Sequence, residues 1–185
     1  MDAPSPEVLR ARRRWRFDGR ERPAWAEEPG PGQISVWDFP RPPRIEPESR
    51  RVRVEHGGVV VAESRTALRV LETAGAPSFY LQRDDVDTAL LAPSAAESLC
   101  EWKGRACHFD VRVHRQVAAE AVWSYRDPYP EFELLHGRFA FHPARLDVCW
   151  LGEVRARPQP GGYYGGWVTP DLSGPFKGGP ASGAW

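Results

Sequence analysis

The sequence predicts a mainly β fold: one domain of short antiparallel strands, barrel- or tent-like, with one or two short helices and an irregular aromatic C-terminal tail. Three observations indicate this class. A hairpin pattern begins near residue 50, several later segments alternate apolar and polar residues, and helical periodicity is scarce. With 185 residues, 41% of them hydrophobic, the chain suffices for one domain with extensions. We expect an Arg/Pro-rich arm over residues 1–49, the β domain over residues 50–151 and a tail packed on it over residues 152–185.

The N-terminal residues carry many prolines and charges and no sustained apolar period. The run "RARRRWR" at residues 10–16 could touch phosphates, but Glu21, Glu27 and Glu28 follow closely, so we expect a solvated arm. The segment "SVWDFPRPPRIEP" is then extended, because each proline disfavours helix at the residue before it. Nucleic-acid binding is not expected, since 25 basic residues balance 25 acidic ones.

The stretch "RRVRVEHGGVVVAES" at residues 50–64 predicts a β-hairpin, because valines alternate on both sides of Gly57-Gly58 and glycine supplies the positive φ of a tight turn. After it, Ser64 could cap a short helix, while Leu68 and Val70 also suit a strand. Both alternatives stay open. The stretch "SFYLQRDDV" that follows predicts a strand leaving into an acidic turn.

Two further strands are predicted around a turn at His114-Arg115, one from Arg105 to Val113 and one from Val117 to Trp123. The first alternates, with Cys107, Phe109, Val111 and Val113 on an apolar face and Ala106, His108, Asp110 and Arg112 on a polar one. "PEFELLHG" has the Pro start and Gly stop of a short helix. "RLDVCWLGE" predicts a half-buried strand with Leu146, Val148 and Trp150 facing one way.

The last 28 residues contain eight Gly and five Pro, yet Tyr163, Tyr164 and Trp167 are interleaved among them. A disordered linker would be poor in aromatic residues. We therefore expect the tail to wrap over the domain or over a neighbouring subunit. "GPFKGG" lacks the strand and helix of a phosphate loop, so Lys177 is expected to be a solvated turn residue.

The cysteines and the apolar runs bear on compartment. The three Cys form no C-x-x-C pair, which indicates reduced thiols. No secretory signal is visible, and no apolar run approaches the length of about 18 residues that a membrane helix needs. The sequence thus predicts a soluble, cytoplasmic protein without a membrane partner.

A family resemblance rests on several stretches in order: "VRVEHGGVVVAESRTALRVLETAGAPSFYLQRDDV", "CEWKGRA", "AVWSYRDP" and "FAFHPARLDVCW". Together with the flanks "SVWDFPRPPR" and "YYGGWVTPDLSGPFKGGP" they resemble the bacterial DUF427 family, over nearly everything after about residue 34. The resemblance implies a compact, mostly β domain of unestablished function, and one family label points towards nucleotidyl transfer. This sequence departs from the family pattern at His108, where an aromatic residue is common, and in its extra Arg-rich arm.

Metal-dependent chemistry has two sets of candidate residues. Asp85-Val86-Asp87 offers paired carboxylates of the kind that hold Mg²⁺ in nucleotidyl transfer, but no phosphate loop accompanies them, so an acidic turn is favoured. Cys100, Cys107 and Cys149 lack the close pairing of a zinc site. No metal site is predicted, and no cofactor is identified.

A thiol, an amine and an imidazole lie close together in "CEWKGRACHFDV". Cys100 and His108 are the candidate catalytic residues: Lys103 could stabilise a Cys100 thiolate, and His108 could act as its base if the chain folds back. The alternative is a half-buried Cys that anchors a turn. Whether the protein is an enzyme stays open.

A ligand pocket is predicted beside this stretch. Lys103 offers a mobile cation and Gly104 allows close approach of the backbone. Cations beside aromatic residues are typical of pockets for planar, anionic small molecules. The predicted lining is Tyr80, Arg83, Lys103, Gly104, Trp123 and Tyr125. The competing interpretations are that these aromatics simply fill the core, or that the protein is a non-catalytic structural or interaction protein, a homo-oligomer formed through its tail.

Overall fold

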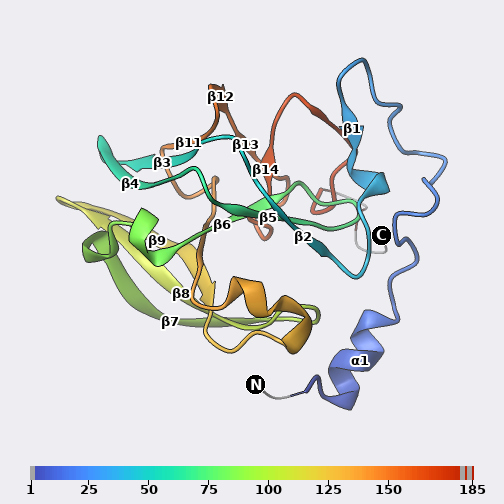
Figure 1. Ribbon diagram of the computed structural model, residues 1–185, viewed down its shortest axis with the longest axis horizontal. Coiled ribbons are helices and arrows are strands. Elements are labelled where there is room, and N and C mark those ends of the chain that lie inside the picture. Colours follow the sequence, from blue (N-terminus) through green and yellow to red (C-terminus); the bar gives the residue numbers. More distant parts are fainter. Residues whose placement is uncertain (1–2, 180–181, 183–184) are drawn as a thin grey trace.

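The computed structural model describes residues 3–179, 182 and 185, and its regular structure is mainly β (Figure 1). The predicted class is therefore confirmed. The largest sheet has seven strands in the order β2-β5-β6-β10-β9-β8-β7, and within the described part of the chain it stays open instead of closing into a barrel. Its strands are β2 (Arg44–Pro47), β5 (Leu68–Leu71), β6 (Ser78–Leu81), β10 (Phe139–Phe141), β9 (Gln116–Tyr125), β8 (Gly104–Val113) and β7 (Leu91–Cys100).

A second, four-stranded sheet has the order β12-β11-β3-β4. It consists of β12 (Val154–Arg155), β11 (Val148–Leu151), β3 (Val52–His56) and β4 (Val59–Ser64). Two short pairs complete the strands: β1 (Ile34–Ser35) runs parallel to β15 (Leu172–Ser173), and β13 (Arg157–Pro158) runs antiparallel to β14 (Trp167–Val168). Among the described residues, the helices are α1 (Pro6–Arg12) and four 3₁₀ turns, η1 (Val36–Asp38), η2 (Arg83–Asp85), η3 (Thr88–Leu90) and η4 (Pro130–Leu135).

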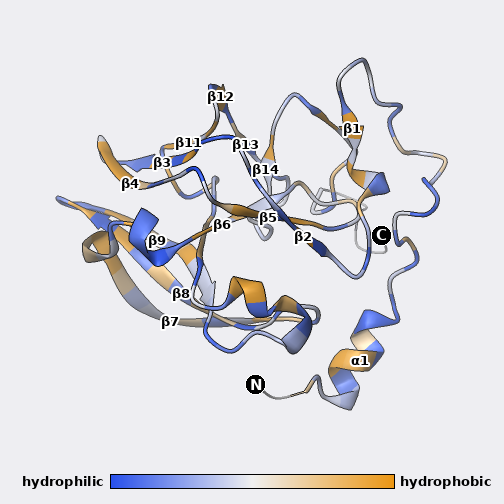
Figure 2. Cartoon of the chain, viewed as in Figure 1, coloured by the Kyte–Doolittle hydropathy of each residue, from blue (hydrophilic) through white to orange (hydrophobic). Residues whose placement is uncertain are grey.

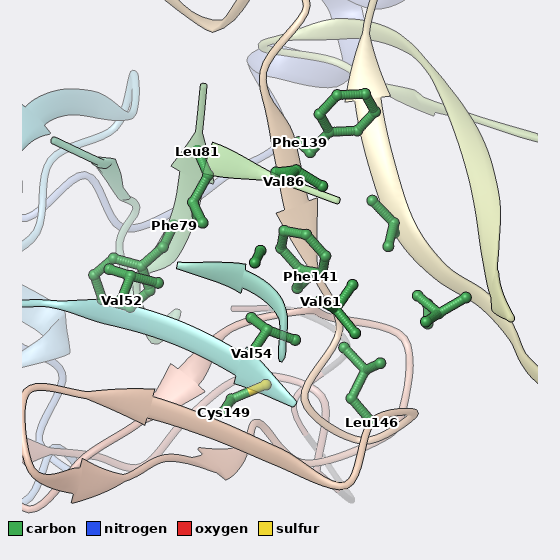
Figure 3. Packing of buried hydrophobic residues seen from close by; sticks show 14 of the residues in the cluster. Val52, Val54, Val61, Phe79, Leu81, Val86, Phe139, Phe141, Leu146 and Cys149 are labelled. Atoms are coloured by element: carbon green, nitrogen blue, oxygen red, sulfur yellow. The ribbon is translucent and has the colours of Figure 1, made fainter. Parts of the chain in front are cut away.

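The main hydrophobic core joins the two larger sheets (Figure 3). Val52 and Val54 of β3 are fully buried, and they pack in one cluster with Phe79 of β6 and Phe141 of β10. Residues two apart on a strand share a face, so the valine alternation that predicted β3 corresponds to one face buried in the core.

The predicted hairpin is confirmed as β3 and β4. Gly57 and Gly58 both have positive φ, of 58° and 76°, in the turn between the strands. A Cβ at Gly57 would lie 2.8 Å from the Val113 side chain, so this position requires glycine for its space as well as its backbone.

The question left open after Ser64 is settled for a strand, since Leu68 to Leu71 form β5. The strands predicted on either side of His114-Arg115 are present as β8 and β9, and His114 has a positive φ of 52° in their turn. The short helix predicted near residue 130 is present as 3₁₀ turns, η4.

Strand β7 was not predicted. Its ten residues alternate in exposure, but the inward positions carry small residues such as Ser94, Ala96 and Ser98. Residues of this kind have low β propensity, so the pattern lacks the Val and Ile signal of a strand. The side chains leave room on this face of the sheet, and the cavity described below lies there.

Two predicted strand faces are corrected. On β8, Ala106 of the face expected to be polar is buried in a second cluster with Tyr80 and Tyr125, while Arg112 on that face is exposed. On β11, the buried residues are Cys149 and Leu151, while Val148 and Trp150 are half-buried; Leu146, before the strand, is buried in the main core. The pairing with β3 explains the second correction, because Cys149 lies opposite Val54 and Leu151 opposite Val52.

The N-terminal residues are packed, so the prediction of a solvated arm is wrong for much of this segment. Figure 2 shows apolar residues on α1 between polar ones. Val8 of this helix is buried. Arg12 donates to the carbonyl oxygens of Glu101 and Trp102, and its guanidinium lies over the Trp102 ring. The other arginines of the run "RARRRWR" are exposed, as expected.

The described part of the tail lies on its own domain. Trp167 is fully buried in the main core, and its indole N–H donates to the carbonyl oxygen of Phe141 at 2.9 Å. No helix among the described residues has the length and hydrophobicity to cross a membrane.

Candidate functional site

A cavity of about 580 Å³ lies on the β7-β8-β9 side of the large sheet, and its size is that of a small-molecule site. Strands β5 to β9 supply one part of the wall, with Val70, Ser78, Tyr80, Ser98, Cys100, His108, Trp123 and Tyr125. The N-terminal segment and the tail supply another part, with Trp15, Gln159, Tyr163, Tyr164 and Lys177.

One end of the cavity is built around Glu72, which follows β5 directly. The Lys177 ammonium lies 2.6 Å from Oε1 of this carboxylate, and an Arg41 guanidinium nitrogen lies 3.4 Å from it. Lys103 Nζ is 3.9 Å from Oε2, which is too far for a hydrogen bond. We call these four residues the Glu72 cluster.

The protonation states of the Glu72 cluster follow from mutual stabilisation. Burial alone would raise the pKa of Glu72, but the three cations, Lys177 foremost, lower this pKa to about 2. Burial alone would lower the pKa of Lys103, yet Cys100, Tyr80 and Glu72 favour the ammonium and raise its pKa above the usual value. At neutral pH, Glu72 is therefore a carboxylate and Lys103 is a cation.

Positive charge is in excess at this end of the cavity. Besides Glu72, the nearby carboxylate is Glu101, which accepts a hydrogen bond from the Trp15 indole at 2.7 Å. Three cations, Arg41, Lys103 and Lys177, thus face two carboxylates. Buried charge is costly unless it is paired, so this end favours an anion.

Lys177 was expected to be solvated, and that expectation is wrong. The residue is 5% exposed, and its ammonium lies near the Trp15 and Tyr164 rings as well as against Glu72. Gln159 holds the tail here, because its amide donates to the Lys177 carbonyl oxygen and accepts from Ala76 N–H. The Glu72 partner comes from far earlier in the chain, so nothing near Lys177 in the sequence could indicate it.

Aromatic side chains form the middle of the wall. Tyr80, Trp123 and Tyr125 all line the cavity, and the Trp123 indole N–H lies 3.2 Å from the Tyr80 hydroxyl oxygen. The Trp123 and Tyr80 rings are perpendicular, with their centroids 6.1 Å apart. A tail glycine, Gly165, closes over Trp123, since a Cβ there would lie 2.3 Å from the indole.

The structure does not bring Cys100 and His108 together as nucleophile and base, although both line the cavity. Cys100 lies opposite Gly104 on β8. His108 is further along the same strand, about 13 Å from Gly104 at 3.3 Å per residue. Its Nε2 instead lies 2.9 Å from the Ser98 hydroxyl oxygen. Cys100 is half-buried beside Lys103, a proximity that the sequence left open.

Two residues predicted to bind ligand lie elsewhere. Arg83 is exposed on η2 and does not line the cavity. Gly104 closes the turn between β7 and β8 with a positive φ of 100°, so its role there is that of a turn residue. Lys103, in contrast, lines the cavity.

The residues considered for metal chemistry have structural partners. Asp85 accepts a hydrogen bond from the Ser64 hydroxyl, and Asp87 caps η3 through Ala89 N–H. Cys149 is buried in the core, which raises the pKa of its thiol, and the Cys107 thiol lies 3.3 Å from the Ser124 carbonyl oxygen. Within residues 3–179, 182 and 185, no group of three His, Cys, Asp or Glu side chains is arranged to hold a metal ion.

Several lining residues had not been singled out as site residues from the sequence. Glu72, Trp15, Gln159, Tyr164 and His142 all line the cavity. A signal existed for Glu72 and His142: each is a polar residue directly after a strand, "LRVL" or "FAF", where a strand end meets a site or a turn. The others come from segments whose docking depends on distant contacts.

Comparisons with known proteins give one family match. A family model described as a domain of unknown function (DUF427) covers residues 44–152. No curated protein matches the chain. Trp15, Arg41, Gln159, Tyr164 and Lys177 lie outside the matched range, so much of the cavity's closure comes from segments that flank the family domain.

Proposed function

The chain belongs to the DUF427 family, whose description states no function, and from that premise we propose that this member binds a small organic anion with a planar part. The observation that carries the proposal is the position of Lys103. Its ammonium borders the cavity, is largely buried, and has its nearest carboxylate oxygen at 3.9 Å. A carboxylate or phosphate of a ligand would complete its pairing.

The different distances of the three cations from Glu72 support anion binding by Lys103. Lys177 and Arg41 lie close to the Glu72 carboxylate, at 2.6 and 3.4 Å, and hold it in place. Lys103 is less tightly engaged, so its charge remains accessible to a ligand. The adjoining Tyr80, Trp123 and Tyr125 give the ligand an aromatic surface, which favours a flat molecule over a branched one.

The test is a thermal denaturation screen with a panel of aryl carboxylates and aryl phosphates. Members that bind should raise the melting temperature by roughly 5 to 10 °C at about 100 times their Kd. Lys103→Met keeps the aliphatic stem and removes the charge, and Glu72 retains two cations, so this variant should fold but lose the stabilisation.

Arg83→Met is the matched control, because it removes an exposed cation outside the cavity and should leave the stabilisation intact. The proposal is contradicted if a folded Lys103→Met protein responds to the panel like the unchanged protein. It is equally contradicted if no member of the panel stabilises the unchanged protein.

Catalysis and self-association are proposals of lower rank. Cys100 borders the cavity beside Lys103, so a covalent step would involve that thiol, with a base other than His108. Self-association through the tail remains a prediction that native mass would test. The tail surface open to a partner includes Tyr163, which is 74% exposed, whereas Trp167 and Lys177 are buried in their own chain.

A further inference from the structure

The end of the cavity remote from Lys103 is built from two histidines. His108 lies on β8, opposite Trp123 of β9, and His142 follows β10, with its N–H donating to the Ala121 carbonyl oxygen. Both side chains line the cavity. The rise of β8 places His108 about 13 Å from the turn that carries Lys103. Trp123 is level with His108, whereas Tyr125 pairs with Ala106 and so lies between His108 and the turn.

Three imidazole nitrogens at this end are buried without a partner. Neither ring nitrogen of His142 has a hydrogen bond to another described residue, and neither does Nδ1 of His108. The backbone of Gly162 and Tyr163 lies beside the His142 ring without the geometry of a hydrogen bond. His142 is 5% exposed, and an unpaired buried polar atom costs about 1–3 kcal/mol, so these atoms call for a partner from outside the chain.

The histidine end carries no excess charge. Burial lowers the pKa of His108 and of His142, and Arg145 lowers both further, although Glu120 opposes the shift at His108 and the backbone of Tyr163 and Gly162 opposes it at His142. The net lowering favours the neutral form of both rings at pH 7. Arg145 is itself engaged: one guanidinium nitrogen lies 3.1 Å from the Glu120 carboxylate and donates to the carbonyl oxygens of Ala119 and Glu120. A neutral imidazole has one donor and one acceptor, which suits an uncharged polar group.

We propose that His108 and His142 form a second recognition subsite, which takes an uncharged hydroxyl or amide at the far end of the anion bound by Lys103. The ligand class is then an elongated molecule with one anionic end, a flat part beside Tyr125 and Trp123, and one neutral hydrogen-bonding end. This inference rests on the proposed function, since it places the remaining part of the same ligand.

The two ends of the cavity differ in net charge, and this difference sets the orientation in which the ligand binds. The Glu72 cluster has an excess of positive charge, whereas Glu120 and Arg145 cancel at the histidine end. An anionic group is favoured at the first end and a neutral group at the second. A site built to hydrogen-bond a hydroxyl discriminates against an analogue without it, because buried polar groups are then left unpaired.

The test uses matched pairs from the aryl acid panel, each pair consisting of a rigid biaryl carboxylate with and without a terminal hydroxyl. Isothermal titration should show about tenfold tighter binding of the hydroxylated member, the effect of one added hydrogen bond. His142→Leu should remove that preference, so that the ratio of the two Kd values approaches one. His108→Leu repeats the test should His142→Leu fail to fold, as judged by circular dichroism.

Two outcomes separate the inference from the function on which it rests. Equal affinity for both members of each pair, or a preference that survives in the folded histidine variants, would overturn the subsite and leave the anion site standing. Absence of binding by every pair to the unchanged protein would overturn both.

Discussion

Glu72 is the residue on which the charge balance of the cavity depends. It is the carboxylate shared by Arg41, Lys103 and Lys177, and these cations come from three separate parts of the chain. An ion pair of this kind contributes little net stability over an apolar substitute, but removing one partner leaves buried charge uncompensated.

Glu72→Gln should therefore destabilise the protein by about 3–5 kcal/mol, measured by urea denaturation. Glu153→Gln is the matched control, because Glu153 is 92% exposed in its pair with Arg51. Glu153→Gln should lower the free energy of unfolding by less than about 1 kcal/mol. Equal losses of stability from the two substitutions would contradict a stabilising role for the Glu72 carboxylate among its three cations.

The same carboxylate predicts a pH dependence. Its pKa is about 2 in the folded protein and 4.5 in an unperturbed Glu, so the folded state binds this proton less readily. The resulting stabilisation, about 3 kcal/mol, is fully present above pH 4.5 and is lost as the pH falls towards 2. Urea midpoints between these limits should fall more steeply for the unchanged protein than for Glu72→Gln. If the urea midpoints of the two proteins fell in parallel with pH, Glu72 would not be the group responsible for the pH dependence.

At the scale of elements, the tail and β7 make the cavity possible. β7 presents small side chains to the interior, which leaves space, and the tail covers that space at close range through glycines. Gly165 packs on Trp123, and Gly166 lies where a Cβ would come within 2.6 Å of the Ala76 carbonyl oxygen. The glycines of this segment therefore serve close packing, in agreement with a tail that is ordered against its domain.

Gly165→Ala should displace either Trp123 or the tail and cost about 1–3 kcal/mol, since its Cβ would lie 2.3 Å from the indole. Near-ultraviolet circular dichroism should report the changed tryptophan environment. Gly179→Ala is the control, because its Cβ would meet its nearest neighbour, Pro160, at 3.9 Å. An unaltered spectrum and stability for Gly165→Ala would mean that the tail does not close on Trp123.

Local patterns predicted the elements whose causes are local. The valine alternation with Gly57-Gly58 predicted the β3–β4 hairpin, and the polar loop after Cys100 placed Lys103 beside a pocket. β7 was missed because small inward residues leave no strand signal. Lys177 was misjudged because its partner, Glu72, is brought to it by the fold and is distant in sequence.

At the scale of the whole molecule, the cavity is shared between the family domain and its flanks. Residues 44–152 supply Lys103, Trp123 and the histidines, while Trp15, Tyr164 and Lys177 come from outside that range. The sequence predicted a packed tail but a solvated arm, since the apolar period that would have indicated docking is absent from the N-terminal residues. Binding, on this account, requires both flanks to be in place.

The most direct measurement is a ¹H–¹⁵N spectrum of the indole N–H groups during titration with the aryl carboxylates. Trp15 and Trp123 line the cavity, whereas Trp25 is exposed elsewhere and Trp167 lies in the main core. Single Trp→Phe variants would assign the four signals. We expect the Trp15 and Trp123 signals to shift together and saturably while those of Trp25 and Trp167 stay in place. Shifts at Trp25 or Trp167 without any at Trp15 and Trp123, or no shift with any acid, would contradict an anion site in this cavity.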